Sequence, residues 1–116
     1  MHWQLSNPRK VYDAHNHLQD PGLAGVKYDL ASAGNFELGG AVINGMSPED
    51  WGEVNRWKET EPHYYAAYGV HPWCVANLPG NWEAALRRWL STGAVSLGEI
   101  GLDRWISHSD YALQES

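Results

Sequence analysis

Three side chains near the N-terminus have the chemistry and the spacing of metal ligands. Asp13, His15 and His17 occupy every second position of V-Y-D-A-H-N-H-L, residues 11–18. Because successive side chains of a strand point to opposite faces, these three are expected on one face. Neutral imidazole nitrogens are good ligands for zinc and neighbouring divalent ions. The pattern therefore indicates a site for one divalent ion, while two partly exposed surface histidines remain the simpler interpretation.

A second polar motif lies far along the chain, in V-S-L-G-E-I-G-L-D at residues 95–103. Glu99 and Asp103 follow a short apolar run there, and His71 follows another apolar run. In parallel α/β sheets, functional residues gather at the carboxyl ends of the strands. The histidine pair and these three residues are therefore expected on one rim of a sheet.

Four strands alternating with helical segments would produce that rim. Short apolar runs with glycine boundaries or alternating polarity predict strands at 11–18, 39–45, 64–70 and 94–98. Helical spacing of apolar residues predicts helices at 23–33, 48–59 and 82–90, and another helix begins before residue 116. The alternation predicts parallel strands with right-handed crossovers, which is an α/β fold.

The clearest helix signal opens at Ser47. A serine cap, Pro48 at the first helical position and two acids in the first turn are typical of a helix N-terminus. This helix is expected to end near Glu59 and to bury three apolar side chains, Trp51, Val54 and Trp57. The helix at 23–33 has a weaker signal because Gly25 interrupts it.

Composition limits the class of protein. The chain has 116 residues, 43% of them hydrophobic, with seven tryptophans, which suits one domain with a core. A net charge of −6 argues against a broad basic surface for nucleic acid. Nucleic acid could still be a substrate if a metal ion met its phosphate.

The chain carries no sign of export or of membrane insertion. Cys74 is its one cysteine, so an internal disulfide is excluded. The first ten residues lack the apolar core of a signal peptide, and no apolar run approaches the ~20 residues that span a bilayer. A cytoplasmic protein without a membrane partner is expected.

Three motifs together resemble the signatures of the TatD-type metal-dependent hydrolases. They are D-A-H-N-H-L at 13–18, G-V-H-P-W at 69–73 and G-E-I-G-L-D at 98–103, in the family's order and across almost the whole chain. The resemblance implies a (β/α)8 barrel with a one- or two-metal centre. It also implies hydrolysis of phosphodiester bonds, since characterised members include deoxyribonucleases.

The resemblance assigns roles residue by residue. It implies that His15 and His17 bind one metal ion, and that Glu99 binds it too and bridges to a second, as a catalytic residue. His71 lies where the family keeps a histidine near the substrate phosphate, although a histidine before proline is as typical of a loop held by backbone hydrogen bonds. The two acids Asp13 and Asp103 are expected to be structural or to support the ligands.

The implied cofactors are two divalent ions, of magnesium, manganese or zinc. They would polarise a phosphoryl oxygen and lower the pKa of a bound water toward about 7, which makes hydroxide available as a nucleophile. DNA or a smaller phosphodiester is the expected substrate.

Length leaves three hypotheses open. A (β/α)8 barrel takes ~250 residues, so residues 1–116 are expected to be a single partial domain, the N-terminal half of the barrel. In the family, two histidines and an aspartate from later strands complete the metal centre. The chain is then a piece of an active hydrolase, or a half-barrel that associates with another copy or a complementary half through unpaired strand edges, or a catalytically incomplete remnant that binds metal.

Overall fold

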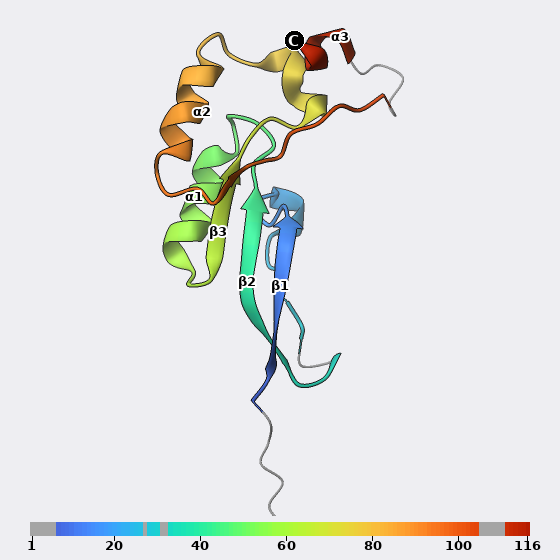
Figure 1. Cartoon of the computed structure of the whole chain (residues 1–116), viewed down its shortest axis with the longest axis vertical. Coiled ribbons are helices and arrows are strands. Elements are labelled where there is room, and N and C mark those ends of the chain that lie inside the picture. The colour runs from blue at the N-terminus through green and yellow to red at the C-terminus, as the bar shows by residue number, and fades with distance from the viewer. Residues whose placement is uncertain (1–6, 27, 31–32, 105–110) are drawn as a thin grey trace, which may run out of the picture.

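The computed structural model describes residues 7–26, 28–30, 33–104 and 111–116 (Figure 1). In chain order the elements are β1 (Arg9–Asn16), the 3-10 helix η1 (Pro21–Leu23), β2 (Phe36–Asn44), α1 (Trp51–Thr60), β3 (Tyr64–Tyr68), the 3-10 helix η3 (Pro72–Asn77), α2 (Trp82–Leu90), β4 (Ser96–Leu97) and α3 (Tyr111–Glu115). None of the helices in these ranges is long and apolar enough to cross a membrane.

The four strands form one parallel sheet in the order β1-β2-β3-β4. This confirms the predicted sheet of four parallel strands. Because all strands run the same way, their carboxyl ends meet at one rim, toward the top of Figure 1. The rim is where the sequence placed the polar residues.

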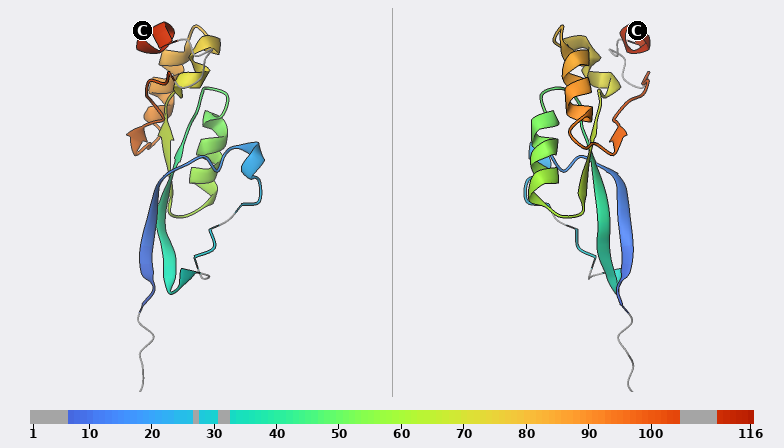
Figure 2. Two further views of the ribbon diagram at one scale, coloured as in Figure 1. Left: turned by 90° about the vertical axis from the view of Figure 1, so that its right-hand side faces the viewer. Right: turned by 60° about the vertical axis from the view of Figure 1, so that its left-hand side comes forward.

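The core lies between the sheet and helices α1 and α2, both of which pack against β3. Figure 2 shows α1 beside the strands from two further sides. Six side chains form the buried cluster: Leu18, Ile43, Trp51, Val54, Ala66 and Tyr68. The indole N–H of Trp51 donates to the carbonyl of Gly69 at 2.9 Å, so the start of α1 is tied to the end of β3.

The apolar stripe predicted for residues 82–90 packs as expected. Ala85, Leu86, Trp89 and Leu90 of α2 lie against the buried cluster. The ring of Trp89 is 5.4 Å from that of Tyr68, centroid to centroid. Helix α2 therefore packs against the carboxyl-terminal end of β3, which pairs with the short strand β4.

The helix predicted at 23–33 is wrong for the residues described there. The chain instead makes η1, in which the carboxylate of Asp20 accepts the N–H of Gly22 at 2.8 Å. Gly25 then takes a φ of 83°, which a right-handed helix cannot continue through. Residues 27, 31 and 32 lie outside the described part of the chain.

The helix predicted from Pro48 begins three residues later, at Trp51. Residues 48–50 form a turn, closed by the Asp50 N–H donating to the carbonyl of Ser47 at 3.0 Å. Ser47 therefore closes a turn rather than capping the helix. Asp50 takes the N-cap position, but its carboxylate makes no capping hydrogen bond to α1.

Strand limits also differ from the prediction. Strand β2 starts earlier, at Phe36, and β3 ends at Tyr68 instead of continuing to Val70. Strand β4 is reduced to Ser96–Leu97. The chain segments that follow β3 and β4 therefore lie beyond the ends of these strands, where they form part of the rim.

Candidate metal centre

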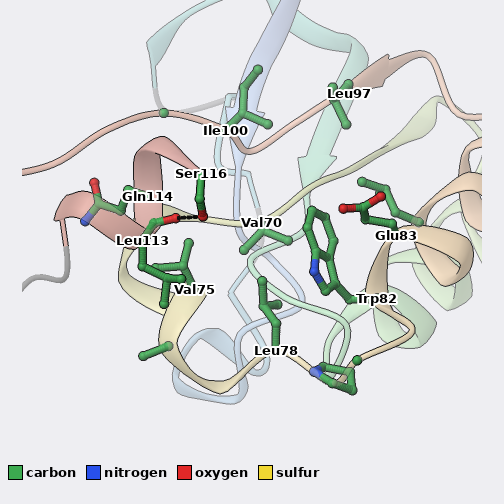
Figure 3. Close-up of a pocket in the computed structure, with 15 residues that line it drawn as sticks. Val70, Val75, Leu78, Trp82, Glu83, Leu97, Ile100, Leu113, Gln114 and Ser116 are labelled. Atoms are coloured by element: carbon green, nitrogen blue, oxygen red, sulfur yellow. Dashed lines mark hydrogen bonds between the residues drawn. The ribbon is translucent and has the colours of Figure 1, made fainter.

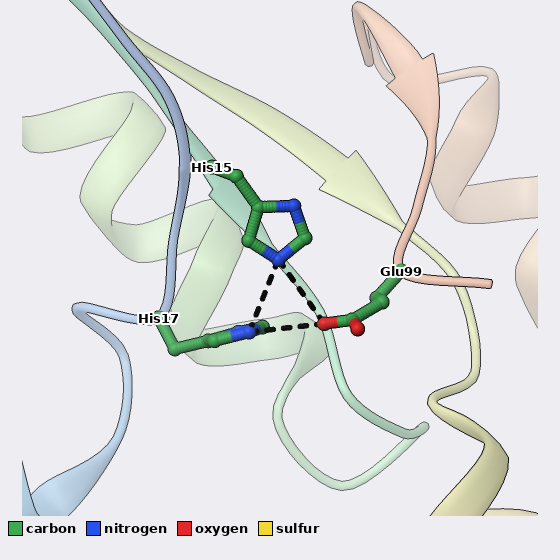
Figure 4. A group of neighbouring side chains, drawn as sticks. All are labelled: His15, His17 and Glu99. Atoms are coloured by element: carbon green, nitrogen blue, oxygen red, sulfur yellow. Dashed lines mark hydrogen bonds and ion pairs between the residues drawn. The ribbon is translucent and has the colours of Figure 1, made fainter. Parts of the chain in front are cut away.

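Two imidazoles and one carboxylate converge at the rim (Figure 4). The Nε2 atoms of His15 and His17 are 3.2 Å apart. The Oε2 atom of Glu99 lies 3.1 Å from the first and 3.0 Å from the second. Residues 84 positions apart in sequence thus form one cluster of three ligand atoms.

The cluster connects the two outer strands of the sheet. His15 lies in β1 and His17 directly after it, whereas Glu99 follows β4. The Glu99 backbone N–H donates to the carbonyl of Gly45 at 3.0 Å, so the segment after β4 is held against the segment after β2. The three side chains therefore meet over the carboxyl ends of β2 and β3.

Glycine makes this close approach possible. A Cβ atom on Gly98 would lie 2.8 Å from Oδ1 of Asn44, and one on Gly69 would overlap the backbone of Glu99. A larger residue at either position would push Glu99 away from the histidines.

The hydrogen bond of His17 selects its tautomer. Its Nδ1 atom lies 2.8 Å from the backbone carbonyl of Asn44, and a carbonyl oxygen only accepts. Nδ1 therefore carries a proton, and whenever the ring is neutral its lone pair is on Nε2, the atom that faces the cluster. A metal-binding histidine is held in this way in most metal sites.

The geometry fits a divalent ion. The His17 Nε2 lone pair and the Glu99 carboxylate are both acceptors, yet they lie 3.0 Å apart, an arrangement that a shared cation stabilises. Ligand atoms lie about 3.4 Å apart around tetrahedral zinc and about 2.9 Å apart around octahedral magnesium, and the observed 3.0–3.2 Å falls between. These three residues would hold such an ion, and a tetrahedral or octahedral ion would need at least one further ligand.

Asp13 does not share the direction of the two histidines, which corrects the expected alternation. The pairing of β1 with β2 shifts register between Asp13 and Asn16, so strict alternation is lost before the strand ends. The Asp13 carboxylate accepts the hydroxyl of Tyr28 at 2.5 Å and the backbone N–H of His15 at 3.1 Å. Burial and the adjacent Asp13 carboxylate raise the pKa of Tyr28, so its hydroxyl remains a donor to Asp13.

His71 lies at the edge of the cluster. Its Nε2 atom is 3.4 Å from Oε1 of Glu99, the oxygen that faces away from the histidine pair. Its Nδ1 accepts the backbone N–H of Trp73 at 3.1 Å. The backbone N–H of His71 donates to the backbone carbonyl of Met46 at 2.8 Å. The residue is thus fixed by backbone hydrogen bonds, as expected for a loop histidine before proline, and it lies beside Glu99.

Asp103 supports the loop that carries His71. Its carboxylate accepts the indole N–H of Trp73, whose ring contacts that of His71 at 5.0 Å between centroids. The Asp103 backbone N–H donates to the side chain of Gln114 at 2.7 Å. Among the described residues Asp103 is outside the cluster of ligand atoms, as expected for a supporting residue.

Three residues of the hydrogen-bond network behind His17 were not identified from the sequence. They are Asn44, through its backbone carbonyl, and the side chains of Gln19 and Asp50. A backbone acceptor leaves no signature in residue type, and Asp50 has the sequence context of an ordinary helix acid. Gln19 follows the His-x-His pair by two positions, which is the one signal that could have indicated it.

Comparison with known proteins agrees with the fold. The structure resembles that of a solved TatD family hydrolase from Entamoeba histolytica, with a TM-score of 0.70 and 20% sequence identity, over 95% of this chain and 44% of the other. This chain therefore spans less than half the length of that protein. The predicted half-barrel of parallel strands and helices is confirmed by this likeness and by the strand order. No curated protein matches the chain significantly in sequence.

The family follows from the sequence. A family model described as TatD related DNase matches residues 12–116, which include the histidine pair, the loop of His71 and the segment of Glu99. Since the match extends over nearly all of the chain, this chain belongs to the family of TatD related DNases.

Proposed function

We propose that these 116 residues are the N-terminal half of a divalent-metal-dependent phosphodiesterase that acts on DNA. The observation that carries the proposal is the convergence of His15, His17 and Glu99 into one cluster with a fixed tautomer at His17. Family membership supports hydrolase chemistry, and the description of the family supports DNA as the substrate class.

The proposed roles follow from the contacts. His15, His17 and Glu99 would hold one divalent ion, and Glu99 would reach a second through Oε1. When bound, such ions polarise a phosphoryl oxygen and lower the pKa of water toward about 7. Glu99 would connect both positions, and the separate contacts of its two oxygens with His17 and His71 support that role.

His71 is the proposed contact to the substrate phosphate. Since Nδ1 accepts the Trp73 N–H, a neutral His71 carries its proton on Nε2 and can donate from that atom. Its side chain is 15% exposed, so the donor is held at the rim by its surroundings. A fixed donor beside a metal-binding carboxylate suits recognition of a phosphate oxygen.

Cys74 is excluded from the proposed chemistry. Burial, followed by the carboxylates of Asp50, Glu49 and Glu99, raises the pKa of its thiol, so it stays protonated at neutral pH.

We also propose a cytoplasmic location, with the absence of a second cysteine in the sequence as support.

A Glu99→Gln variant tests the proposal. The amide keeps the shape of the side chain but removes the negative charge, so we expect Mn²⁺ affinity to fall by on the order of 100-fold, measured by calorimetry. Any Mn²⁺-dependent cleavage of a fluorescent oligonucleotide should fall with it. Glu83→Gln, at an exposed position in the first turn of α2 and outside the cluster, is the matched control and should bind like the wild type. Equal affinity in wild type and Glu99→Gln would refute the proposed site.

A second candidate function is association through the open side of the sheet. Leu97, Ile100 and Leu102 after α2 are each about half exposed or more. Leu97 and Ile100, together with residues of α2 and η3, border a cavity of about 600 Å³ (Figure 3). In the described part of the chain, β4 pairs with β3 alone and β1 with β2 alone. Unpaired strand edges with apolar neighbours promote association between chains.

We expect the isolated chain to self-associate through this surface. Gel filtration between about 1 and 100 μM should show an apparent mass that rises with concentration. Leu97→Lys should shift the chain toward the monomer, because a lysine on an edge strand opposes pairing. Val26→Lys, another exposed apolar residue but far from β4 in sequence, is the control and should leave the profile unchanged. A monomer at every concentration would contradict the proposal.

A further inference from the structure

A second layer of contacts lies behind His17. The carbonyl of Asn44 accepts two side-chain donors at once, Nδ1 of His17 at 2.8 Å and Nε2 of Gln19 at 2.7 Å. Asn44 is the last residue of β2, one position beyond the final β1–β2 pair at Ile43. Its carbonyl therefore accepts hydrogen bonds from these two side chains, at a position where the β1–β2 ladder would have supplied a backbone N–H.

Gln19 has no freedom to act as an ordinary surface amide. It is 5% exposed, and its amino group donates both to Asn44 and to Oδ2 of Asp50 at 2.9 Å. Reversing the amide would place its oxygen against two acceptors, so the orientation is determined. Among the described residues its own Oε1 is buried without a hydrogen-bond partner, a cost that is hard to explain by stability alone.

Asp50 departs from the usual behaviour of its position. At the N-cap of a helix, aspartate normally accepts an N–H of the first turn, but this side chain makes no such bond. Its carboxylate turns back and accepts the N–H of Met46 through both oxygens at 3.0 Å, together with the amide of Gln19. The carboxylate of Asp50 therefore stabilises the loop after β2 instead of capping the first turn of α1.

Hydrogen bonds connect these groups through two shared partners, the amino group of Gln19 and the carbonyl of Asn44. The carboxylate of Asp50 accepts from Gln19, Gln19 donates to Asn44, and His17 donates to the same carbonyl. Because Gln19 and Asp50 hold the carbonyl in place, the Nδ1 proton of His17 has one fixed acceptor. Its Nε2 lone pair then stays directed at His15 and Glu99.

We propose that Gln19 and Asp50 are positioning residues for His17, which fix its tautomer and ring orientation for metal binding through the Asn44 carbonyl. This inference rests on the proposed metal site and goes beyond it, since neither residue offers a ligand atom to the cluster. Partners of metal-binding histidines typically contribute 10–100-fold to metal affinity.

The decisive variant is Gln19→Met, which keeps the length of the side chain and removes both hydrogen bonds. In the metal-free 116-residue chain, long-range ¹H–¹⁵N spectra should show a proton on Nδ1 of His17 that is hydrogen-bonded to a carbonyl, and should show that proton partly lost from Nδ1 in Gln19→Met. Calorimetric titration with Zn²⁺ should show affinity about 10–100-fold weaker. Asp50→Asn, a smaller change, should move both readouts in the same direction.

Glu49→Gln is the matched control for Asp50→Asn, because it removes the same charge from the adjacent position and should change neither readout. If Gln19→Met loses its fold by tryptophan fluorescence, Asp50→Asn decides the question. An unaltered His17 tautomer and Zn²⁺ affinity in a folded variant would overturn the inference. Absence of Zn²⁺ binding by the wild type would instead refute the metal site, while the tautomer measurement would still decide the role of Gln19.

Discussion

Replacing both His15 and His17 by alanine is expected to abolish tight binding of divalent ions by this chain. The two rings supply two of the three ligand atoms in the described cluster. A structural zinc site of four ligands binds with about 10–16 kcal/mol, so each ligand contributes on average about 3 kcal/mol, or on the order of 100-fold in affinity. Calorimetric titration with Zn²⁺ and Mn²⁺ should therefore show no saturable binding in the double variant.

The matched control is His63→Asn. His63 is an imidazole outside the cluster, in the loop before β3, with a φ of 74° that asparagine tolerates better than alanine. We expect this variant to bind metal as the wild type does. If the His15 and His17 double variant retained wild-type affinity, the histidine pair would be a surface feature and the assignment would be wrong.

The isolated 116-residue chain is expected to cleave DNA on the order of 1,000-fold more slowly than a full-length family member. The described residues offer three ligand atoms, which is too few to hold two ions firmly. A metal ion stabilises a phosphoryl transition state by several kcal/mol. If about 4 kcal/mol of that stabilisation is lost, the reaction is about 1,000-fold slower. This chain covers 44% of the solved relative, which leaves room for further ligands elsewhere in a longer protein.

Single-turnover cleavage of a labelled oligonucleotide, with Mn²⁺ or Mg²⁺ and with chelator as the control, measures this difference. Addition of a separately produced C-terminal half from a family member should raise the rate if the open strand edges accept it. Turnover by the isolated chain at the rate of the full-length enzyme would show that the three ligands suffice. That result would contradict the half-site interpretation while leaving the metal site intact.

The parallel strands, most of the helices and the meeting of His15, His17 and Glu99 at one rim could be predicted from the sequence. Alternating strands and helices, the apolar stripe of α2 and the position of Glu99 after a short strand follow from local patterns of hydrophobicity and glycine. Those signals depend on residues that are close together in the sequence, so they can be recognised without knowledge of the tertiary structure. They failed where backbone conformation overrode the pattern, at Gly25 in the predicted helix 23–33 and at the turn that precedes Trp51.

The tertiary structure alone decided how the ligands meet and what holds them. Whether Asp13 joined the histidines depended on a register shift in β1, which is a property of strand pairing rather than of residue type. The tautomer of His17 depended on a backbone carbonyl at the end of β2, 27 residues away. Residue type can indicate which side chains are able to bind a metal ion. Their separations and proton positions are set by contacts between segments distant in sequence, which only the assembled sheet brings together.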